Sequence, residues 1–407
     1  MTLRRLLEEN TVSAYSDFIA ALYPEGANLS AYLRKLVLED DNFYVKAVAA
    51  GEKIDPEIAA AVKNELGILN EIGQIPSAEI RQAVLDADPA CKGDSDSSAG
   101  KGTSDPSAGK GTSDSSAGKG ISLPKWKTED LNLVKDFTKK LAEISHTGYG
   151  IYAKYTFFRV EDGDIVPVAH PDYQDLDQLF EYQRERDLVI KNTEALLDGT
   201  GASNMLLYGD MGTGKSSTIK AVAAAYADRG LRMIELKKNQ LFQIPSVMEE
   251  IASNPLKFII FIDDLSFSGN DDNFSALKAT LEGSITGCGD NCVIYATSNR
   301  RHLVRESAAD RAGSSFDDDL HLNDTLQETM SLAARFGLTI TFSKPGKDEY
   351  LSIVRSLADE YGIAIGDGED EISEEDLILR AEAFAIRRNG RSPRTARQFI
   401  ELLKIGI

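Results

Sequence analysis

The stretch Gly209-Asp-Met-Gly-Thr-Gly-Lys-Ser216 decides the fold of this chain, because it fits the phosphate-loop pattern G-x-x-x-x-G-K-[ST]. Glycines in such a loop allow positive φ angles, so that successive backbone N–H groups can surround a phosphate. Lys215 supplies a mobile cation for the β- and γ-phosphates, and the hydroxyl of Ser216 can bind magnesium. The stretch therefore predicts a site for a nucleoside triphosphate with Mg²⁺.

The residues on either side of the loop predict the strand and the helix that a phosphate loop needs. Asn204-Met-Leu-Leu-Tyr208 is a short apolar run, as in buried parallel strands. Residues 217–229 are rich in alanine and predict a helix that ends before Gly230. This order of strand, loop and helix argues against a chance match. We expect the nucleotide to be bound by the consecutive residues Gly209, Asp210, Met211, Gly212, Thr213, Gly214, Lys215, Ser216 and Ser217.

Length, charge and cysteine content narrow the class of protein. A chain of 407 residues is long enough for two or three domains. The formal net charge of −20 argues against a surface that attracts nucleic acid or anionic membrane as a whole, although it permits a local basic patch. No stretch approaches the roughly 20 apolar residues of a membrane span, and the N-terminus is too polar for a signal peptide. Because Cys91, Cys288 and Cys292 are too few for a disulfide framework, we expect a cytoplasmic location.

A low-complexity segment divides the chain before the phosphate loop. Residues 93–120 repeat Ser-Ala-Gly-Lys-Gly-Thr-Ser-Asp, offer no side chains to a core and predict a flexible linker. Residues 1–92 predict a helical docking or regulatory region, because apolar residues recur three and four positions apart. The helices expected there are Leu3–Leu7, Val12–Leu22, Leu29–Glu39 and Pro56–Leu66.

Residues 121–176 predict an α+β segment that leads to the nucleotide-binding core. A helix is expected over Lys127–Glu143 and a strand over Tyr149–Val160, and Glu161-Asp-Gly-Asp164 indicates a hairpin turn. We place the core at residues 177–345, beginning with a long helix over Asp177–Leu197. Strands then alternate with helices, which predicts an α/β fold with a parallel sheet covered by helices on both faces. The strands are expected at 204–208, 231–236, 257–262, 292–297 and 338–342.

The remaining residues, 346–407, predict a small helical domain. Helices are expected at 347–361, 373–388 and 393–404, with Ser392 as the N-cap of the last and Pro393 in its first turn. Arg394 and Arg397 lie one turn apart near the start of that helix. If the domain covers the nucleotide as a lid, either guanidinium can reach the γ-phosphate.

Polar side chains follow two of the predicted strands. Asp263 and Asp264 end the apolar run that begins at Phe258, and acids at the carboxyl end of a buried parallel strand lie where open α/β sheets bind ligands. After a phosphate loop, we expect Asp263 to hold Mg²⁺ and Asp264 to orient or deprotonate the attacking water. Asn299 ends the next strand, where it, or Ser298, can contact the γ-phosphate or the water. An ordinary strand-to-loop turn is the alternative for this last position.

Arg335 stands between a predicted helix at 326–334 and the strand at 338–342. Surface arginines are common. A guanidinium offered by a neighbouring subunit, however, stabilises charge on a transferring phosphoryl group.

These motifs, in this order, resemble those of an AAA+ ATPase over about residues 177–405. The Asp-Asp pair in place of Asp-Glu is similar to that of replication initiators and helicase loaders. A narrower resemblance is to a bacterial family of predicted ATP-binding proteins catalogued as a domain of unknown function. It rests on the stretches Asp-Asp-Leu-Ser-Phe, Tyr-Ala-Thr-Ser-Asn-Arg-Arg-His-Leu and Arg-Thr-Ala-Arg-Gln-Phe. The resemblance implies Lys215 and Ser216 as Walker A residues, Asp263 and Asp264 as Walker B, Asn299 as sensor 1, Arg335 as the arginine finger and Arg394 as sensor 2.

The chain departs from the family pattern in two places. Ala334 stands where the family usually has an acid before the arginine finger, and Pro393 replaces a frequent glycine. In addition, Asp264 holds its carboxylate about one methylene further back than a glutamate would, which favours slow hydrolysis and a role as a timing switch.

We therefore expect a slow Mg²⁺-dependent ATPase that forms nucleotide-dependent homo-oligomers and couples its nucleotide state to assembly or partner binding. We expect its target to be either a protein bound through the N-terminal helices or a nucleic acid. The nucleic-acid alternative rests on residues 380–397, which hold six arginines and one acid. The alternative is a nucleotide-gated scaffold with negligible turnover, since an intact site does not separate slow from silent. A small-molecule kinase is less favoured, because it explains none of the late arginines.

Overall fold

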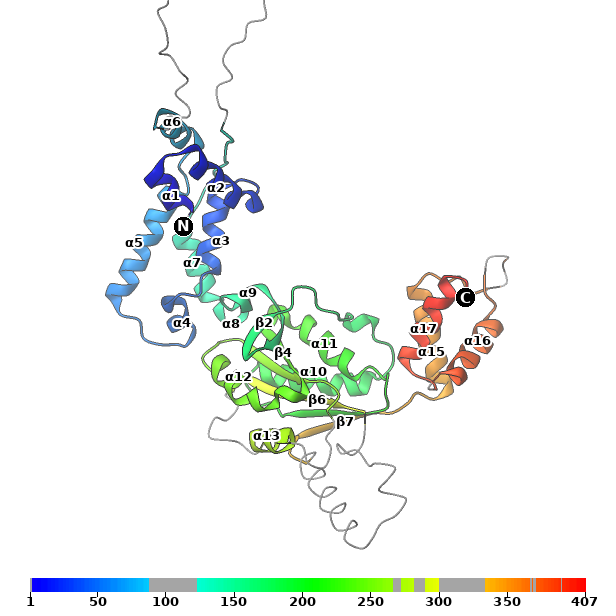
Figure 1. The fold of residues 1–407 in the computed structure, drawn as a ribbon. Helices are drawn as coiled ribbons and strands as arrows, with labels where there is room; N and C mark the ends of the chain where they lie inside the picture. Colours follow the sequence, from blue (N-terminus) through cyan, green and yellow to red (C-terminus); the bar gives the residue numbers. More distant parts are fainter. Residues whose placement is uncertain are drawn as a thin grey trace, which may run out of the picture. The chain divides into compact units, whose positions relative to one another are not determined.

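The computed structural model describes residues 2–87, 123–265, 272–281, 290–299, 334–366, 368, 371–388 and 390–407. The chain divides into two compact units, one formed by Met1–Asp40 and Lys53–Ala142, the other by Asp41–Glu52 and Glu143–Ile407 (Figure 1). Some of the predictions lie outside the described residues. They concern the linker at 93–120, the helix at 326–334 except for its last residue, and the cysteines Cys91 and Cys288. No helix that the structure describes is long and apolar enough to span a membrane.

The first unit is helical, as predicted. Its core packs Tyr15 and Phe18 around Trp126, with ring centroids 5.6 and 5.5 Å from that of the tryptophan. The helix α6 was not predicted, and α5 is longer than expected. The helices are α1 (Thr2–Glu9), α2 (Val12–Leu22), α3 (Leu29–Glu39), α5 (Pro56–Ile72), α6 (Ser77–Ala87) and α7 (Leu133–Ala142).

The predicted helix over Lys127–Glu143 is wrong in its first third, because α7 begins only at Leu133. Lys127 instead pairs with the segment before α3: its N–H donates to the carbonyl of Ala27, and its carbonyl accepts from Leu29. These long-range bonds hold the chain extended, which an amphipathic pattern read along one segment cannot reveal.

A seven-stranded sheet organises the second unit, in the order β2-β1-β4-β5-β6-β3-β7. All neighbours pair in parallel except β1 and β2, which form the predicted hairpin. The predicted parallel sheet is confirmed, and β1 extends it by pairing with β4. The strands are β1 (Phe157–Glu161), β2 (Asp164–Pro167), β3 (Met205–Gly209), β4 (Leu231–Leu236), β5 (Lys257–Ile262), β6 (Cys292–Ser298) and β7 (Leu338–Phe342).

The predicted strand over Tyr149–Val160 is wrong in its first half. The chain forms two short helices there, α8 (Ile144–Thr147) and α9 (Ile151–Lys154), before β1 begins. Gly148 and Gly150 have φ angles of +70° and +57°, which a continuing strand cannot contain.

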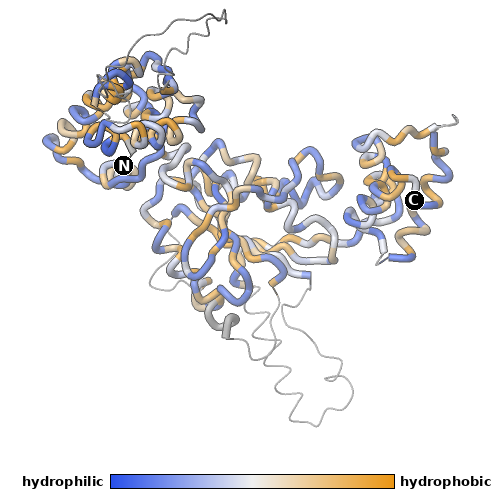
Figure 2. The backbone as a smooth tube through the Cα atoms, turned by 45° about the horizontal axis from the view of Figure 1, so that its top comes forward, coloured by the Kyte–Doolittle hydropathy of each residue, from blue (hydrophilic) through white to orange (hydrophobic). Residues whose placement is uncertain are grey.

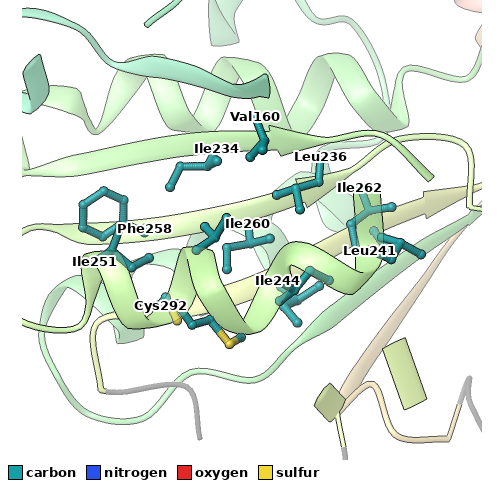
Figure 3. Close-up of a cluster of buried hydrophobic side chains, with 14 of the residues drawn as sticks. Val160, Ile234, Leu236, Leu241, Ile244, Ile251, Phe258, Ile260, Ile262 and Cys292 are labelled. Atoms are coloured by element: carbon teal, nitrogen blue, oxygen red, sulfur yellow. The ribbon is translucent and has the colours of Figure 1, made fainter. Parts of the chain in front are cut away.

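Helices cover both faces of the sheet, as predicted. One face packs against α12 (Ile244–Ile251) and α13 (Asp272–Leu281), in the cluster that Figure 3 shows with Cys292 among the aliphatic side chains. The other face packs against α10 (Gln183–Leu197) and α11 (Lys215–Ala225). The central strands are accordingly buried and mostly apolar (Figure 2), although β4 carries Arg232 and Glu235.

The long helix predicted over Asp177–Leu197 is broken in the structure. A 3-10 turn at Leu176–Gln178 is followed by α10 from Gln183, and Glu181 and Tyr182 between them have φ angles of +57° and +54°. The break lets Phe180 pack against the helical C-terminal domain while the Tyr182 ring packs on Phe342 of β7. A continuous helix cannot direct both rings to these places.

The C-terminal domain consists of α15 (Lys347–Glu360), α16 (Glu374–Arg387) and α17 (Pro393–Lys404), close to the predicted ranges. These helices bury their own apolar cluster, which includes Tyr350 and Phe399. Ser392 caps α17 as predicted, because its Oγ accepts from the N–H of Thr395 at 3.1 Å.

Candidate nucleotide-binding site

The phosphate loop leaves the carboxyl end of β3, between β6 and β7, and ends at the first residue of α11. Gly209 has a φ of +137°, and a Cβ there would lie 2.0 Å from the carbonyl oxygen of Phe342. Gly214 caps α11 with a φ of +91°. Both positions therefore require glycine, and the loop is closed against β7 by the bond from the Asp210 N–H to the same Phe342 carbonyl.

Lys215 is buried, with 5% of its surface exposed, and its ammonium group is held inside the loop. Nζ donates to the carbonyls of Gly209 and Asp210 at 3.0 and 2.7 Å. It also donates to Oδ1 of Asn299 at 3.1 Å. The register of the sheet explains the last contact: Tyr208 pairs with Ser298, so the next residues, Gly209 and Asn299, come side by side. The cation is thus positioned before any phosphate arrives.

Burial lowers the pKa of Lys215, because the ammonium group has lost water, while Asp210, Asp264 and Asp263 partly oppose this shift. A bound phosphate would raise that pKa again. At a pH between the pKa of Lys215 in the free protein and its pKa with nucleotide bound, binding must take up a proton. The affinity for nucleotide is therefore expected to fall as the pH rises through the pKa of Lys215 in the ligand-free protein. Titrating ADP without Mg²⁺ from pH 7.5 upwards, where the phosphates are already ionised, checks this. Lys215→Met should bind weakly with no such fall; an affinity that rises with pH would contradict the assignment.

The two predicted carboxylates follow β5 and are tied to the phosphate loop and to β6. Oδ1 of Asp263 accepts from the Ser216 hydroxyl at 2.6 Å and from the Thr297 hydroxyl at 2.6 Å. Asp264 has a φ of +50°, which is uncommon outside glycine, and its Oδ1 accepts from Nδ2 of Asn299 at 2.6 Å. Strained backbone of this kind concentrates at functional sites. The hydrogen bonds of Asp263 to Ser216 and Thr297 tie the pair to the phosphate loop and to β6, which an isolated polar turn would not do.

A pocket of about 810 Å³ extends from the loop toward the C-terminal domain. The predicted residues that line it are Met211, Gly212, Thr213, Gly214, Lys215, Ser216, Ser217, Asp263, Asp264, Asn299 and Arg394. Gly209 and Asp210 shape the loop behind it. The volume lies within the usual range for small-molecule sites, roughly 300–1,000 Å³.

Sequence reasoning missed one wall of this pocket, the segment 172–182 and Arg186 beyond it. The segment contributes Asp172, Tyr173, Gln174, Gln178, Leu179, Phe180 and Tyr182 to the lining. Its available signal was a run of aromatic and amide side chains that extends into the first residues of the helix predicted over Asp177–Leu197. Thr297 of β6 and two apolar residues of α15, Ile353 and Leu357, were also missed.

The C-terminal domain contacts the phosphate loop directly. The Arg394 N–H donates to the Gly212 carbonyl at 3.3 Å, and a Cβ at Gly212 would lie 3.1 Å from the Ser392 hydroxyl. Arg397 lines the pocket, and its guanidinium donates to the side-chain oxygen of Gln174. The start of α17 therefore stands over the site, as the lid interpretation predicts.

Arg335 does not line the pocket, and it lies at the opposite edge of the sheet. It precedes β7, where a Cβ at Gly337 would touch Ser203 and the Leu338 N–H donates to Asn204, just before β3. The phosphate loop follows the other end of β3, at least about 13 Å away for a strand of this length. Arg335 is thus too far from the site of its own chain to reach a phosphate there.

Residues 152–406 match the family described as "Protein of unknown function (DUF815)". The chain belongs to this family. The resemblance seen in the sequence is thereby confirmed. No curated protein shows significant similarity to the chain.

Solved structures of AAA+ proteins are similar to part of the chain. One is a single-residue variant of RuvB from Thermotoga maritima, with 16% identity over 56% of this chain and 63% of that one, at a TM-score of 0.36. A second RuvB variant has 15% identity over 57% and 72%, at 0.32. PCH-2 from C. elegans has 16% identity over 57% and 66%, at 0.38. The chain spans less than two thirds of the first of these and of PCH-2.

The second unit has an AAA+-like fold. Its phosphate loop follows β3, the paired carboxylates follow β5, the asparagine follows β6, and a helical domain follows β7. The fold of this DUF815 protein is therefore AAA+-like, with its phosphate loop at the N-terminus of α11.

Proposed function

We propose that this protein binds ATP with Mg²⁺ between the phosphate loop and the helical lid, and hydrolyses it slowly. The observation that carries the proposal is one hydrogen-bonded network at the carboxyl ends of β3, β5 and β6. In it, Asn299 joins the ammonium group of Lys215 to the carboxylate of Asp264. A phosphate-binding cation and the group that would activate water thus share a partner.

The charges of the pocket favour a polyanion. Its lining has five basic residues, Arg186, Lys215, Lys220, Arg394 and Arg397, and three acidic ones, Asp172, Asp263 and Asp264. This basic excess occurs in a chain whose net charge is −20. The first turn of α11 adds backbone N–H groups and the positive end of the helix dipole, which attract phosphate.

The residues at the mouth of the pocket fit Mg²⁺. The Ser216 hydroxyl and the Asp263 carboxylate are hard oxygen donors 2.6 Å apart. No group of three acidic, histidine or cysteine ligands occurs among the described residues, which suits an ion held largely by nucleotide oxygens and water. When bound, Mg²⁺ would neutralise charge on the β- and γ-phosphates.

The remaining roles follow from position. Asp264 would orient the attacking water and accept its proton. Asn299 would contact the γ-phosphate once the ammonium group of Lys215 has turned from Asn299 to that phosphate. Arg394, at the start of α17, would report the γ-phosphate to the lid. The proposed outcome of turnover is a change of assembly or of partner, since the lid contacts the loop through Gly212.

Phosphate release by wild type and Asp264→Asn tests the proposal. Asparagine keeps the shape of the side chain and tolerates the left-handed backbone, so the site should persist without its base. We expect turnover to fall at least about 100-fold while ATP affinity changes little. Asp162→Asn is the matched control, because Asp162 has a φ of +51° in the β1–β2 turn, outside the pocket. Equal turnover in all three proteins, at a rate no faster than protein-free ATP, would favour the nucleotide-gated scaffold.

The structure weakens the argument for nucleic acid. Of the arginines at 380–397, Arg391 forms a bidentate pair with Glu382, and Arg394 and Arg397 line the pocket. Arg380, Arg387 and Arg388 remain, all exposed and without an ion pair to another side chain among the described residues. Three arginines are a small footprint for phosphate backbone, so we propose a protein target.

A further inference from the structure

We propose that Thr297 is the positioning residue for both carboxylates of this site, an inference that rests on the proposed function. Thr297 lies in β6, 2% exposed, while both carboxylates are exposed after β5. The register brings the three residues together: Ile262 pairs with Ala296, so Asp263 and Thr297 are next to each other where the strands end.

The direction of each hydrogen bond at Thr297 is fixed by chemistry. The Asp264 N–H can only donate, and it lies 3.0 Å from the Thr297 hydroxyl oxygen, which must therefore accept. The single hydroxyl proton is then left for Oδ1 of Asp263, at 2.6 Å. One buried hydroxyl thus holds the carboxylate of Asp263 and the backbone of Asp264 at once.

This arrangement accounts for the strained residue beside it. The N–H of Asp264 also donates to Oδ1 of Asp263 at 3.1 Å, and the Leu265 N–H donates to the Thr297 carbonyl at 2.7 Å. Thr297 therefore contacts the turn on both sides of Asp264, whose φ is +50°. A residue in this conformation persists only when its surroundings hold it, and its carboxylate then points toward Asn299.

Packing alone does not require threonine here. Every residue of β6 is buried, and the neighbours Val293, Ile294 and Ala296 are apolar. Valine has nearly the same shape and is favoured in strands, so the hydroxyl is the part of Thr297 that packing leaves unexplained. Removing it should leave Oδ1 of Asp263 held only by the Ser216 hydroxyl and the Asp264 N–H, and should loosen Asp264.

Thr297→Val tests the inference through Mg²⁺ dependence. Its affinity for ADP in EDTA should stay within about threefold of wild type, because the phosphate loop is untouched. The Mg²⁺ concentration needed to saturate the ATP complex should rise about 10- to 100-fold, as when groups that orient a metal ligand are removed. Thr297→Ser keeps the hydroxyl and should restore the wild-type requirement. If the valine variant does not fold, as judged by thermal unfolding, Thr297→Ala replaces it.

Thr193→Val is the matched control. Thr193 is equally buried, in α10, and its hydroxyl bonds Val189 and Tyr295 away from the pocket. An unchanged Mg²⁺ requirement in Thr297→Val overturns the inference, as does a Thr297→Ser variant that is as impaired as Thr297→Val. The inference is also wrong if Thr297→Val loses as much affinity for ADP in EDTA as it loses in its Mg²⁺ requirement. If the wild type binds nucleotide in a Mg²⁺-dependent way but shows no turnover, the ATPase proposal is wrong, whereas the role of Thr297 is unaffected. A wild type that binds no nucleotide overturns both.

Discussion

Lys215→Ala is expected to weaken ATP binding at least about 100-fold, because it removes charge-assisted hydrogen bonds to phosphate worth about 3 kcal/mol. The ammonium group is already placed in the loop, held by the Gly209 and Asp210 carbonyls and by Asn299. To meet a phosphate, it has only to turn from these partners toward the ligand. Titration of a fluorescent ATP analogue measures the loss directly.

The control for this variant is Lys191→Ala, which removes an exposed lysine of α10 outside the pocket. It should bind ATP as wild type does. If Lys215→Ala binds with wild-type affinity, the pocket does not hold the triphosphate at the loop. If binding is lost but phosphate release equals that of wild type, the release comes from a contaminant, and the scaffold function is favoured.

The sheet and the site residues at its edge could be predicted because their signals are local. The run from Phe258 to Ile262 is apolar at every position, and it is buried at every position in the structure. The two carboxylates and Asn299 then follow their strands directly, and parallel strands end at the same edge. Pattern and position were sufficient there, with no knowledge of which strands are neighbours.

The parts that failed depend on contacts between distant residues. The break before α10 exists because Phe180 and Tyr182 pack against different parts of the unit, α15–α17 and β7. Their helical periodicity carries no record of that. Thr297 was missed for a similar reason: a threonine in an apolar strand resembles any strand residue until the pairing of β5 with β6 sets it beside Asp263.

Arg335→Ala is expected to lower ATP turnover about 1,000-fold or more while leaving ATP affinity within a few-fold of wild type, if Arg335 acts as an arginine finger. Its position makes the role possible only between subunits. Arg335 lies before β7 and the phosphate loop lies beyond the far end of β3, so the two are at opposite edges of one sheet. A head-to-tail contact between copies brings such edges together.

Mixing two inactive variants decides whether the site is shared. Lys215→Ala keeps Arg335 but should bind ATP only weakly, whereas Arg335→Ala should bind ATP but lacks the guanidinium. In assemblies formed from an equal mixture, about a quarter of the interfaces join a subunit that keeps Lys215 to a neighbour that keeps Arg335. ATP turnover should therefore recover to about that fraction of the wild-type rate. Light scattering without nucleotide, with ADP and with ATP–Mg²⁺ shows whether the subunits assemble under these conditions. Arg184→Ala, which removes an exposed side chain of α10, is the control and should remain active alone. If mixing restores no turnover although ATP drives assembly, Arg335 does not act at the site of a neighbouring subunit. Its distance from the phosphate loop of its own chain then excludes it from the chemistry.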